Sequence, residues 1–294
     1  MQIANPIYDT VFKYMMSDSR VAKSLLSAII GERIVELEFT STEYTLKTGI
    51  EKRQIDRTFE QITVCRFDFA AKIETSTGEY KTIIIELQKA KFAADIMRFR
   101  RYLGLMYQSA ENTYDEHRVK ARQIYCIYFL NYEVGLSDSP VIKVDHKVSD
   151  LTTGEELDNR NEFIESLNHK TWIVQVRQLK ERRRNELENL LSIFDQHNVC
   201  NDKHILNVDE NQFSEEYRHI IRKLREACES QKVRGEMQME DDYISELLMK
   251  DEIIAEQDKA IEEKDKAIEE KDKSLLEQQE RIAELEKLLE NKSK

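Results

Sequence analysis

The sequence predicts an α/β protein with a mixed central sheet flanked by helices, followed by a C-terminal helical coiled-coil tail. Two apolar strand patterns surround a short turn at residues 67–91, and a helical pattern separates them from another apolar strand. A seven-residue repeat occupies the C-terminal end. A length of 294 residues fits one large domain with an appendage. We place the domain at residues 1–235 and the tail at residues 236–294.

Two helices are expected at the start of the chain. Asn5 and Pro6 suit an N-cap and a first helical position, and apolar residues then recur at helical spacing. A second helix is expected from about Asp18 until Gly31, because glycine readily ends helices. Residues 34–62 are ambiguous and are expected to form one strand and a loop.

The order of the following elements predicts a crossover within a mixed sheet. Residues 91–117 follow a helical pattern, and residues 122–134 (RQIYCIYFLNYEV) form a buried apolar strand. Strand, helix and strand in succession are typical of a parallel crossover. Further along, we expect a strand at residues 171–176, with Trp172 in the core, and helices at residues 180–196 and 214–230.

The hairpin at residues 67–91 raises a question about two acidic residues. A loop centred on Thr77, with Gly78 in a left-handed position, places Asp68 opposite Glu86. Glu86 and Gln88 share a face because strand side chains alternate. Like charges directly opposite each other destabilise a sheet, and burying an unpaired carboxylate is costly.

A divalent cation would remove this cost. Mg²⁺ prefers hard oxygen ligands and is often bound by one or two carboxylates together with waters. Two other arrangements are also open: each acid meets a Lys or Arg, or both acids point into solvent at a sheet edge.

The segment Asp68, a spacer of 17 residues, and then Glu86-Leu87-Gln88 resembles the metal site of PD-(D/E)XK nucleases. It is most similar to the branch of Rpn-type recombination-promoting nucleases and PD-(D/E)XK family transposases, in which Gln often replaces the motif's Lys. That branch also opens with a helix like residues 8–18, which carries Asp9, Phe12 and Lys13. The helix after its hairpin often carries an Arg and a Tyr, which Arg98 and Tyr102 match loosely.

The resemblance covers roughly residues 5–230 and implies a restriction-endonuclease-like fold that hydrolyses DNA phosphodiester bonds. It implies Mg²⁺, or Mn²⁺ in its place, held by Asp68, Glu86 and the backbone carbonyl of Leu87. Gln88 would orient the attacking water or contact the phosphate. It would not act as a cation or a general base, because an amide does not titrate. Asp9 would reach the site from the first helix; alternatively, it only forms an i,i+4 salt bridge.

Basic residues are available for DNA phosphates around this motif. The residues assigned to this role are Lys13, Arg98, Arg100, Arg101 and Tyr102. A second basic segment, residues 177–184, offers more positive charge. Such residues would position a DNA backbone without reading bases. Alternatively, both segments are solvated helix faces or partners for the acidic tail.

The net charge of −12 does not exclude DNA as a partner, because the negative charge is concentrated in the tail. Residues 236–294 hold 20 acidic and 10 basic residues, whereas residues 1–235 hold 37 acidic and 35 basic residues. The predicted domain is therefore nearly neutral.

The tail repeats DKAIEEK in tandem at residues 258–264 and 265–271. One position of the seven-residue repeat is always apolar: Ile254, Ile261, Ile268, Leu275, Ile282 and Leu289. This pattern favours a coiled coil and a homo-oligomer. A solitary charged helix is the alternative, because Glu262–Lys266 and Glu269–Lys273 are favourable i,i+4 pairs.

The absence of several sequence motifs excludes other classes of protein. The sequence has no Walker A loop, no GxGxxG, no HExxH and no CxxC pair, and its six histidines show no metal spacing. Four cysteines are expected to be reduced. The first residues lack the pattern of a signal peptide, and no apolar run would span a bilayer. We therefore expect a cytoplasmic protein without a membrane partner.

The sequence thus predicts a Mg²⁺-dependent DNA endonuclease acting in recombination or DNA mobility. A catalytically inactive module that binds nucleic acid or protein, on a nuclease scaffold and oligomerised by the coiled coil, is the alternative. A third reading is a coiled-coil scaffold whose head is incidental.

Overall fold

A computed structural model describes residues 1–40, 43–49, 60–66, 68–89, 95–108, 114–115, 118–119, 122–157, 161–180 and 183–292. The chain forms two compact units, Met1–Asp241 and Asp242–Lys294. Helix α8 (Gln231–Lys292) contributes its first residues to the first unit and supplies the second.

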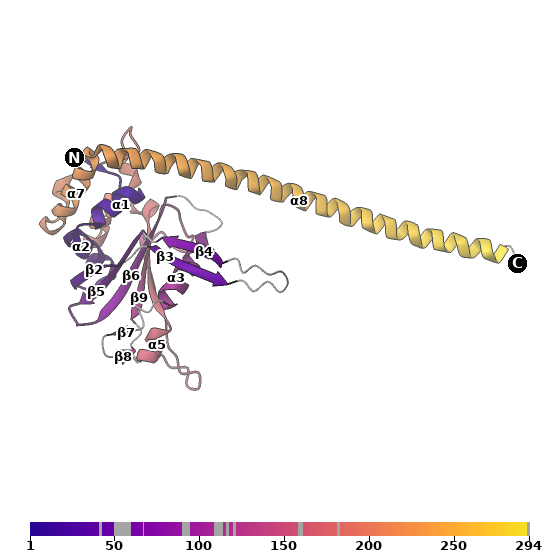
Figure 1. Ribbon diagram of the computed structural model, residues 1–294, viewed down its shortest axis with the longest axis horizontal. Helices are drawn as coiled ribbons and strands as arrows, with labels where there is room; N and C mark the ends of the chain where they lie inside the picture. Colours follow the sequence, from indigo (N-terminus) through magenta and orange to yellow (C-terminus); the bar gives the residue numbers. More distant parts are fainter. Residues whose placement is uncertain are drawn as a thin grey trace. The chain divides into compact units, whose positions relative to one another are not determined.

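A six-stranded mixed sheet forms the centre of the first unit (Figure 1). Its strand order is β10 (Val141–Val144), β11 (His169–Gln175), β9 (Gln123–Leu130), β6 (Tyr80–Gln88), β5 (Phe69–Thr75) and β2 (Ile34–Phe39). The three adjacent strands β11, β9 and β6 are parallel to one another, and the remaining neighbouring pairs are antiparallel. The expected mixed α/β sheet is therefore confirmed.

The remaining helices and strands surround this sheet. The helices are α1 (Asp9–Met16), α2 (Ser19–Ile30), α3 (Asp95–Gln108), α5 (Glu162–Ser166), α6 (Glu186–Leu191) and α7 (Arg218–Glu229). Three strand pairs lie outside it: β1 (Gln2–Ala4) with β12 (Ile205–Asn207), β3 (Glu43–Gly49) with β4 (Glu60–Arg66), and β7 (Tyr114–Asp115) with β8 (Arg118–Val119).

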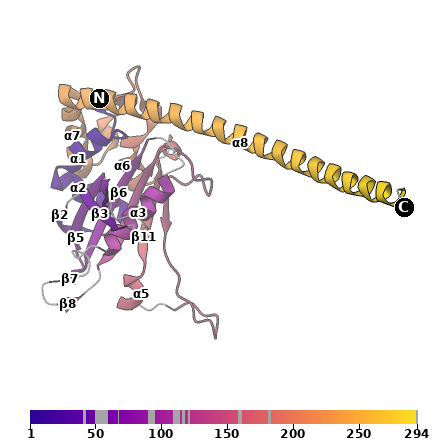
Figure 2. The same ribbon diagram turned by 45° about the vertical axis from the view of Figure 1, so that its right-hand side comes forward.

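Two apolar cores cover the two faces of the sheet. On one face, α1, α2 and α7 pack against alternate strand residues such as Ile83 and Ile85, and Trp172 is buried here as expected. On the other face, Leu105 and Met106 of α3 pack against Ile84 and the other alternate residues. Figure 2 shows α1, α2 and α7 gathered on one side of the first unit. The strand alternation thus separates an α1 face from an α3 face.

The second helix follows its local signals closely. The Asp18 side chain accepts a hydrogen bond from the backbone N–H of Arg20, and Gly31 ends α2 with φ of 73°. Only glycine adopts this left-handed conformation without strain. The predicted start and end of α2 are therefore confirmed.

The expected N-cap of the first helix is wrong. Asn5 follows strand β1, and its side chain accepts a hydrogen bond from the Ile7 N–H and exchanges hydrogen bonds with Gln196. Helix α1 begins four residues later, after Tyr8. The pairing of β1 with β12 positions Asn5, a long-range interaction that the local pattern does not contain.

Three other expected elements differ in length. Within residues 91–117, helix α3 ends at Gln108, and Tyr114–Asp115 forms a short strand. Residues 34–62 contribute strands rather than one strand and a loop, since β2, β3 and the start of β4 are described there. The apolar pattern at residues 180–196 forms only the short helix α6 followed by 3₁₀ turns. Residues 90–94, 109–113 and 181–182 lie outside the described residues.

The predicted hairpin is confirmed in type and register. Phe69 pairs with Ile85 and Ala70 with Ile84, and Gly78 takes a φ of 77° in the turn. Continuing this register by one step places Asp68, the residue before β5, level with Glu86. The predicted crossover is confirmed as well, because α3 connects the parallel strands β6 and β9.

The second unit, Asp242–Lys294, is helical throughout its described residues. Its repeated apolar position stays exposed to solvent: Ile254, Ile261, Ile268, Leu275 and Ile282 each retain between 53% and 56% of their accessible surface. None of the described helices combines the length and apolar character that a membrane span requires.

Candidate active site

The carboxyl end of β6 carries the central part of the candidate site. Glu86 and Gln88 lie on the α3 face of the sheet, in line with Ile84, and they retain only 3% and 6% of their accessible surface. On the neighbouring strand, Tyr128 is the register partner of Glu86. The apolar strand β6 therefore buries the side chains of an acid and an amide almost completely.

Asp68 reaches the same position from the start of β5. One oxygen of its carboxylate, Oδ2, accepts a hydrogen bond of 2.6 Å from the backbone N–H of Leu87. The residue as a whole is half-buried, but its carboxyl group is enclosed. The Leu87 amide thus holds Asp68 against the segment that carries Glu86, as the hairpin register predicts.

Burial and nearby negative charges raise the pKa values of Asp68 and Glu86. Burial, followed by the negative charge of Asp9, raises the pKa of Asp68 to about 7, although the Leu87 N–H opposes the rise. Burial, followed by the charge of Asp68, raises the pKa of Glu86 well above its ordinary value. The positive charges of Arg98 and Lys13 act in the opposite direction on both groups.

Asp9, at the first position of α1, belongs to this electrostatic group, because it influences both Asp68 and Glu86. Its Oδ2 forms the i,i+4 salt bridge with Lys13 Nζ at 2.6 Å, so the alternative arrangement is also present. Its Oδ1 is buried and, among the described residues, receives no hydrogen bond. Asp9 therefore forms the expected salt bridge and also lies close enough for its charge to act on both acids.

The oxygen atoms at this position fit a hard divalent cation. Within the described part of the chain, Glu86 Oε1 is buried and has no hydrogen-bond partner. Among these residues, no three His, Cys, Asp or Glu side chains form a preformed metal cluster. Mg²⁺, however, commonly uses one or two carboxylates and keeps several waters. The pair Asp68 and Glu86, with the carbonyl of Leu87, is such a set.

The residues expected to contact phosphates lie in different environments. Arg98 is half-buried and acts on both acids, whereas Arg100 and Arg101 of α3 are exposed. Lys13 is also exposed. The ring of Tyr102, by contrast, packs into the core between α3 and the sheet.

The second basic segment has a structural role at one position. Arg183 contacts Asp195 and the carbonyl of Leu179, so part of this segment serves the fold.

Several residues around the candidate site have little or no signal in the local sequence. Tyr128 packs its ring against Phe99 of α3, with centroids 4.9 Å apart, and lies beside Glu86. A tyrosine within the apolar run IYCIYFL is a weak signal that could have indicated it. Lys89, Glu240 and Asp241 also lie near the site; their long-range contacts leave no local pattern.

Comparison of the chain with protein-family models, with curated proteins and with solved structures gave no match.

Proposed function

We propose that this protein is a divalent-metal-dependent DNA endonuclease with Asp68, Glu86 and Gln88 as its catalytic residues. The observation that carries the proposal is the pair of enclosed carboxylates at the end of β6, one with a buried oxygen that has no hydrogen-bond partner among the described residues. Burying such a pair without a cation is unfavourable, and perturbed acids of this kind cluster at functional sites.

Mg²⁺, or Mn²⁺ in its place, would be held by Asp68, Glu86 and the carbonyl of Leu87. When bound, such a cation polarises a phosphate and makes water a better nucleophile. The restriction-endonuclease-like arrangement implied by the resemblance is part of this proposal.

The chain's own residues supply positioning and charge. Gln88 offers an amide that can orient a water or donate to a phosphate oxygen, but it cannot take up a proton. Arg98 places positive charge beside both acids, which favours their ionised, ligating forms. Asp9 adds a third carboxylate whose buried Oδ1 can accept a hydrogen bond from a water.

DNA phosphates would meet the exposed cations on either side of the acids. Lys13 on α1 and the exposed Arg100 and Arg101 on α3 are available for such contacts. Contacts of this kind depend on salt and carry no sequence information. The proposed enzyme therefore positions a DNA backbone and does not need to read bases.

The tail is proposed to join copies of this chain through the exposed apolar position of its repeat. Five residues at this position each expose more than half of their surface in a single chain. Packing them against a second helix would bury them. Recombination or DNA mobility is the cellular context that the resemblance suggests.

A binding module without catalysis is the second candidate. Gln88 favours it, because a non-titrating amide occupies the position where the nuclease motif usually has lysine. Metal-dependent cleavage separates the two candidates.

Nicking of supercoiled plasmid tests the proposal with Mg²⁺, with Mn²⁺ and with EDTA. The proteins compared are the wild type, Asp68→Ala and Glu86→Ala, with Asp18→Asn as the matched control. Asp18 is an acid whose charge partner is Arg20, and Asn caps a helix as well as Asp does. Metal-dependent nicking that only the two site variants lose supports the proposal. Equal nicking by all the proteins contradicts it, and DNA binding without nicking favours the binding module.

A further inference from the structure

The first turns of α8 carry acidic residues that contact segments next to the candidate site. Glu236 and Glu240 are four residues apart and are therefore neighbours on the helix surface, and Asp241, which follows directly, is buried. All three belong to the first compact unit. Glu236 accepts a hydrogen bond from the Thr10 hydroxyl on α1.

Glu240 supplies a helix cap that the local sequence lacks. The first N–H groups of a helix have no partner within it, and Tyr8, the N-cap residue of α1, makes no capping hydrogen bond with its side chain. The backbone N–H of Asp9 instead donates to Glu240 Oε2 at 2.9 Å. The helix dipole favours a carboxylate at this end of a helix, whereas burial and the charge of Asp9 raise the pKa of Glu240 to about 7.

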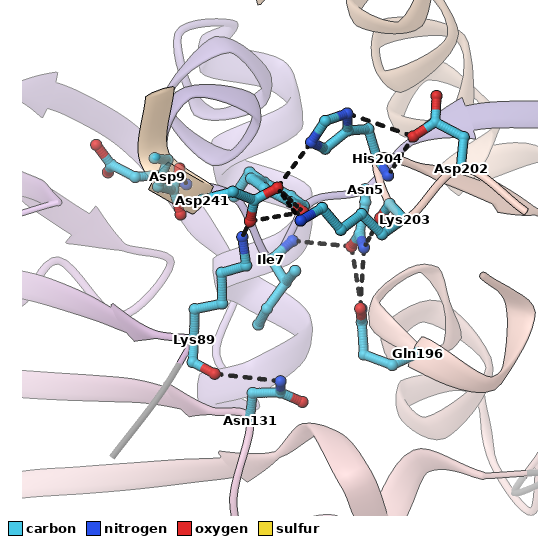
Figure 3. Close-up of polar contacts among 12 residues, drawn as sticks. Asn5, Ile7, Asp9, Lys89, Asn131, Gln196, Asp202, Lys203, His204 and Asp241 are labelled. Carbon is cyan, nitrogen blue, oxygen red and sulfur yellow. Dashed lines mark hydrogen bonds and ion pairs between the residues drawn. The ribbon is translucent and has the colours of Figure 1, made fainter. Parts of the chain in front are cut away.

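Asp241 connects three separate segments of the chain (Figure 3). Its buried carboxylate accepts hydrogen bonds from the Tyr8 hydroxyl at 3.0 Å, from His204 Nε2 at 2.9 Å and from Lys89 Nζ, and it pairs with Lys203 Nζ at 2.9 Å. Burial favours the neutral acid, but the hydrogen bonds from Lys89, Lys203 and His204 outweigh burial and hold the pKa of Asp241 well below its ordinary value. Asp241 is therefore an ionised carboxylate that links the segments around Tyr8, Lys89 and His204.

Lys89 extends this network to the candidate site, because it directly follows Gln88. Its Nζ lies 3.3 Å from the centroid of the Tyr8 ring, in addition to its contact with Asp241. Its carbonyl accepts a hydrogen bond of 3.2 Å from Asn131 Nδ2 (Figure 3). The residue after the catalytic segment is thus held through both its side chain and its backbone.

We propose that Glu240 and Asp241 are positioning residues: from helix α8 they hold Asp9 and Lys89, and through them the acids of the candidate site. This inference rests on the proposed function for its catalytic consequence. Neither residue touches the reacting atoms; Glu240 acts through the start of α1, and Asp241 acts through the end of β6. The last residues of α8 within the first compact unit thereby become part of the candidate site's support.

Full-length variants test the inference by two independent readouts. The variants are Asp241→Asn, Glu240→Ala and Glu240→Gln, and the matched control is Glu246→Gln. Glu246 lies on the same helix but only pairs with Lys250 at the surface. The readouts are plasmid nicking, resolved into kcat and KM for DNA, and the affinity of the protein alone for Mn²⁺. Urea unfolding of each variant identifies any that fails to fold.

Misplacing the site acids is expected to lower kcat about tenfold or more, while KM for DNA changes less than about twofold. Mn²⁺ affinity is expected to fall about tenfold. Glu240→Gln keeps a hydrogen-bond acceptor for the Asp9 N–H and should restore much of what Glu240→Ala loses. The control should behave like the wild type. A purely stabilising role would lower the urea midpoint and leave kcat and Mn²⁺ affinity of the folded protein unchanged.

The outcomes separate this inference from the proposed function. Wild-type values of kcat and Mn²⁺ affinity in folded Asp241→Asn and Glu240→Ala overturn the inference while leaving the nuclease proposal intact. If the wild type binds Mn²⁺ without nicking, the nuclease proposal fails, and weaker Mn²⁺ binding by the variants still supports the inference. If the wild type neither nicks nor binds Mn²⁺, both proposals fall.

Discussion

Replacing Asp68 with asparagine should stabilise the metal-free protein at alkaline pH. Asp68 is enclosed, lies level with Glu86 and is influenced by the charge of Asp9. Asparagine removes the negative charge and keeps an oxygen that can accept the Leu87 N–H. Sites selected for function often carry such a cost in stability.

The magnitude follows from the pKa of Asp68, which burial and Asp9 raise from 3.8 to about 7. Because each pH unit between the two values corresponds to about 1.4 kcal/mol, ionising this group costs the folded protein roughly 4 kcal/mol. Asparagine must itself be desolvated, so we expect a net gain of about 2 to 4 kcal/mol in the free energy of unfolding.

The sign of the pH dependence is determined by which state holds the proton. Below pH 4 both the folded and the unfolded chain protonate Asp68, so the wild type and Asp68→Asn should be similar. Between about pH 4 and pH 7 the folded state keeps the proton that the unfolded state releases. The stability of the wild type therefore falls relative to the variant across this range and stays lower above it.

Urea unfolding at pH 5 and pH 8.5, in EDTA and in Mg²⁺, measures this difference. The advantage of Asp68→Asn should grow from pH 5 to pH 8.5 in EDTA and shrink in Mg²⁺, because the cation stabilises only the wild-type site. Asp18→Asn is the control: hydrogen bonding to Arg20 lowers the pKa of Asp18 to about 2, so its removal should be neutral or slightly destabilising at pH 8.5. An Asp68→Asn protein no more stable than the wild type at pH 8.5 would show that ionising Asp68 does not destabilise the folded protein.

Three further predictions concern the site and the tail. Glu86→Gln should abolish both metal-dependent nicking, measured by plasmid assay, and the stabilisation of the protein by Mg²⁺, measured by thermal unfolding. If the variant loses only one of these two properties, Glu86 is not the shared requirement for metal binding and cleavage. Arg98→Gln should raise the pKa of the neighbouring acids, so the pH midpoint of Mn²⁺ binding should move upward by about half a unit or more; an unchanged midpoint would show that Arg98 does not act on them. The double variant Ile261→Asn and Ile268→Asn should lower the particle mass measured by light scattering, while the circular dichroism of the first unit's strands persists; an unchanged mass would contradict assembly through this repeat.

Local patterns in the sequence were sufficient for several elements. The alternation of apolar residues and the turn glycine Gly78 set the hairpin register, which aligned Asp68 with Glu86. Asp18 and Gly31 marked the two ends of α2 correctly. In each case the determining interaction lies within a few residues along the chain, so spacing and residue type suffice.

The arrangement of α1 and α8 around the candidate site depends on long-range packing. Asn5 looked like a helix cap, but the pairing of β1 with β12 drew it into other hydrogen bonds, and Glu240 caps α1 from a segment more than 200 residues away. No local periodicity encodes such contacts, because they depend on which faces the packed core brings together. Local sequence patterns thus indicated the two acids of the hairpin, whereas the fold determined what surrounds them.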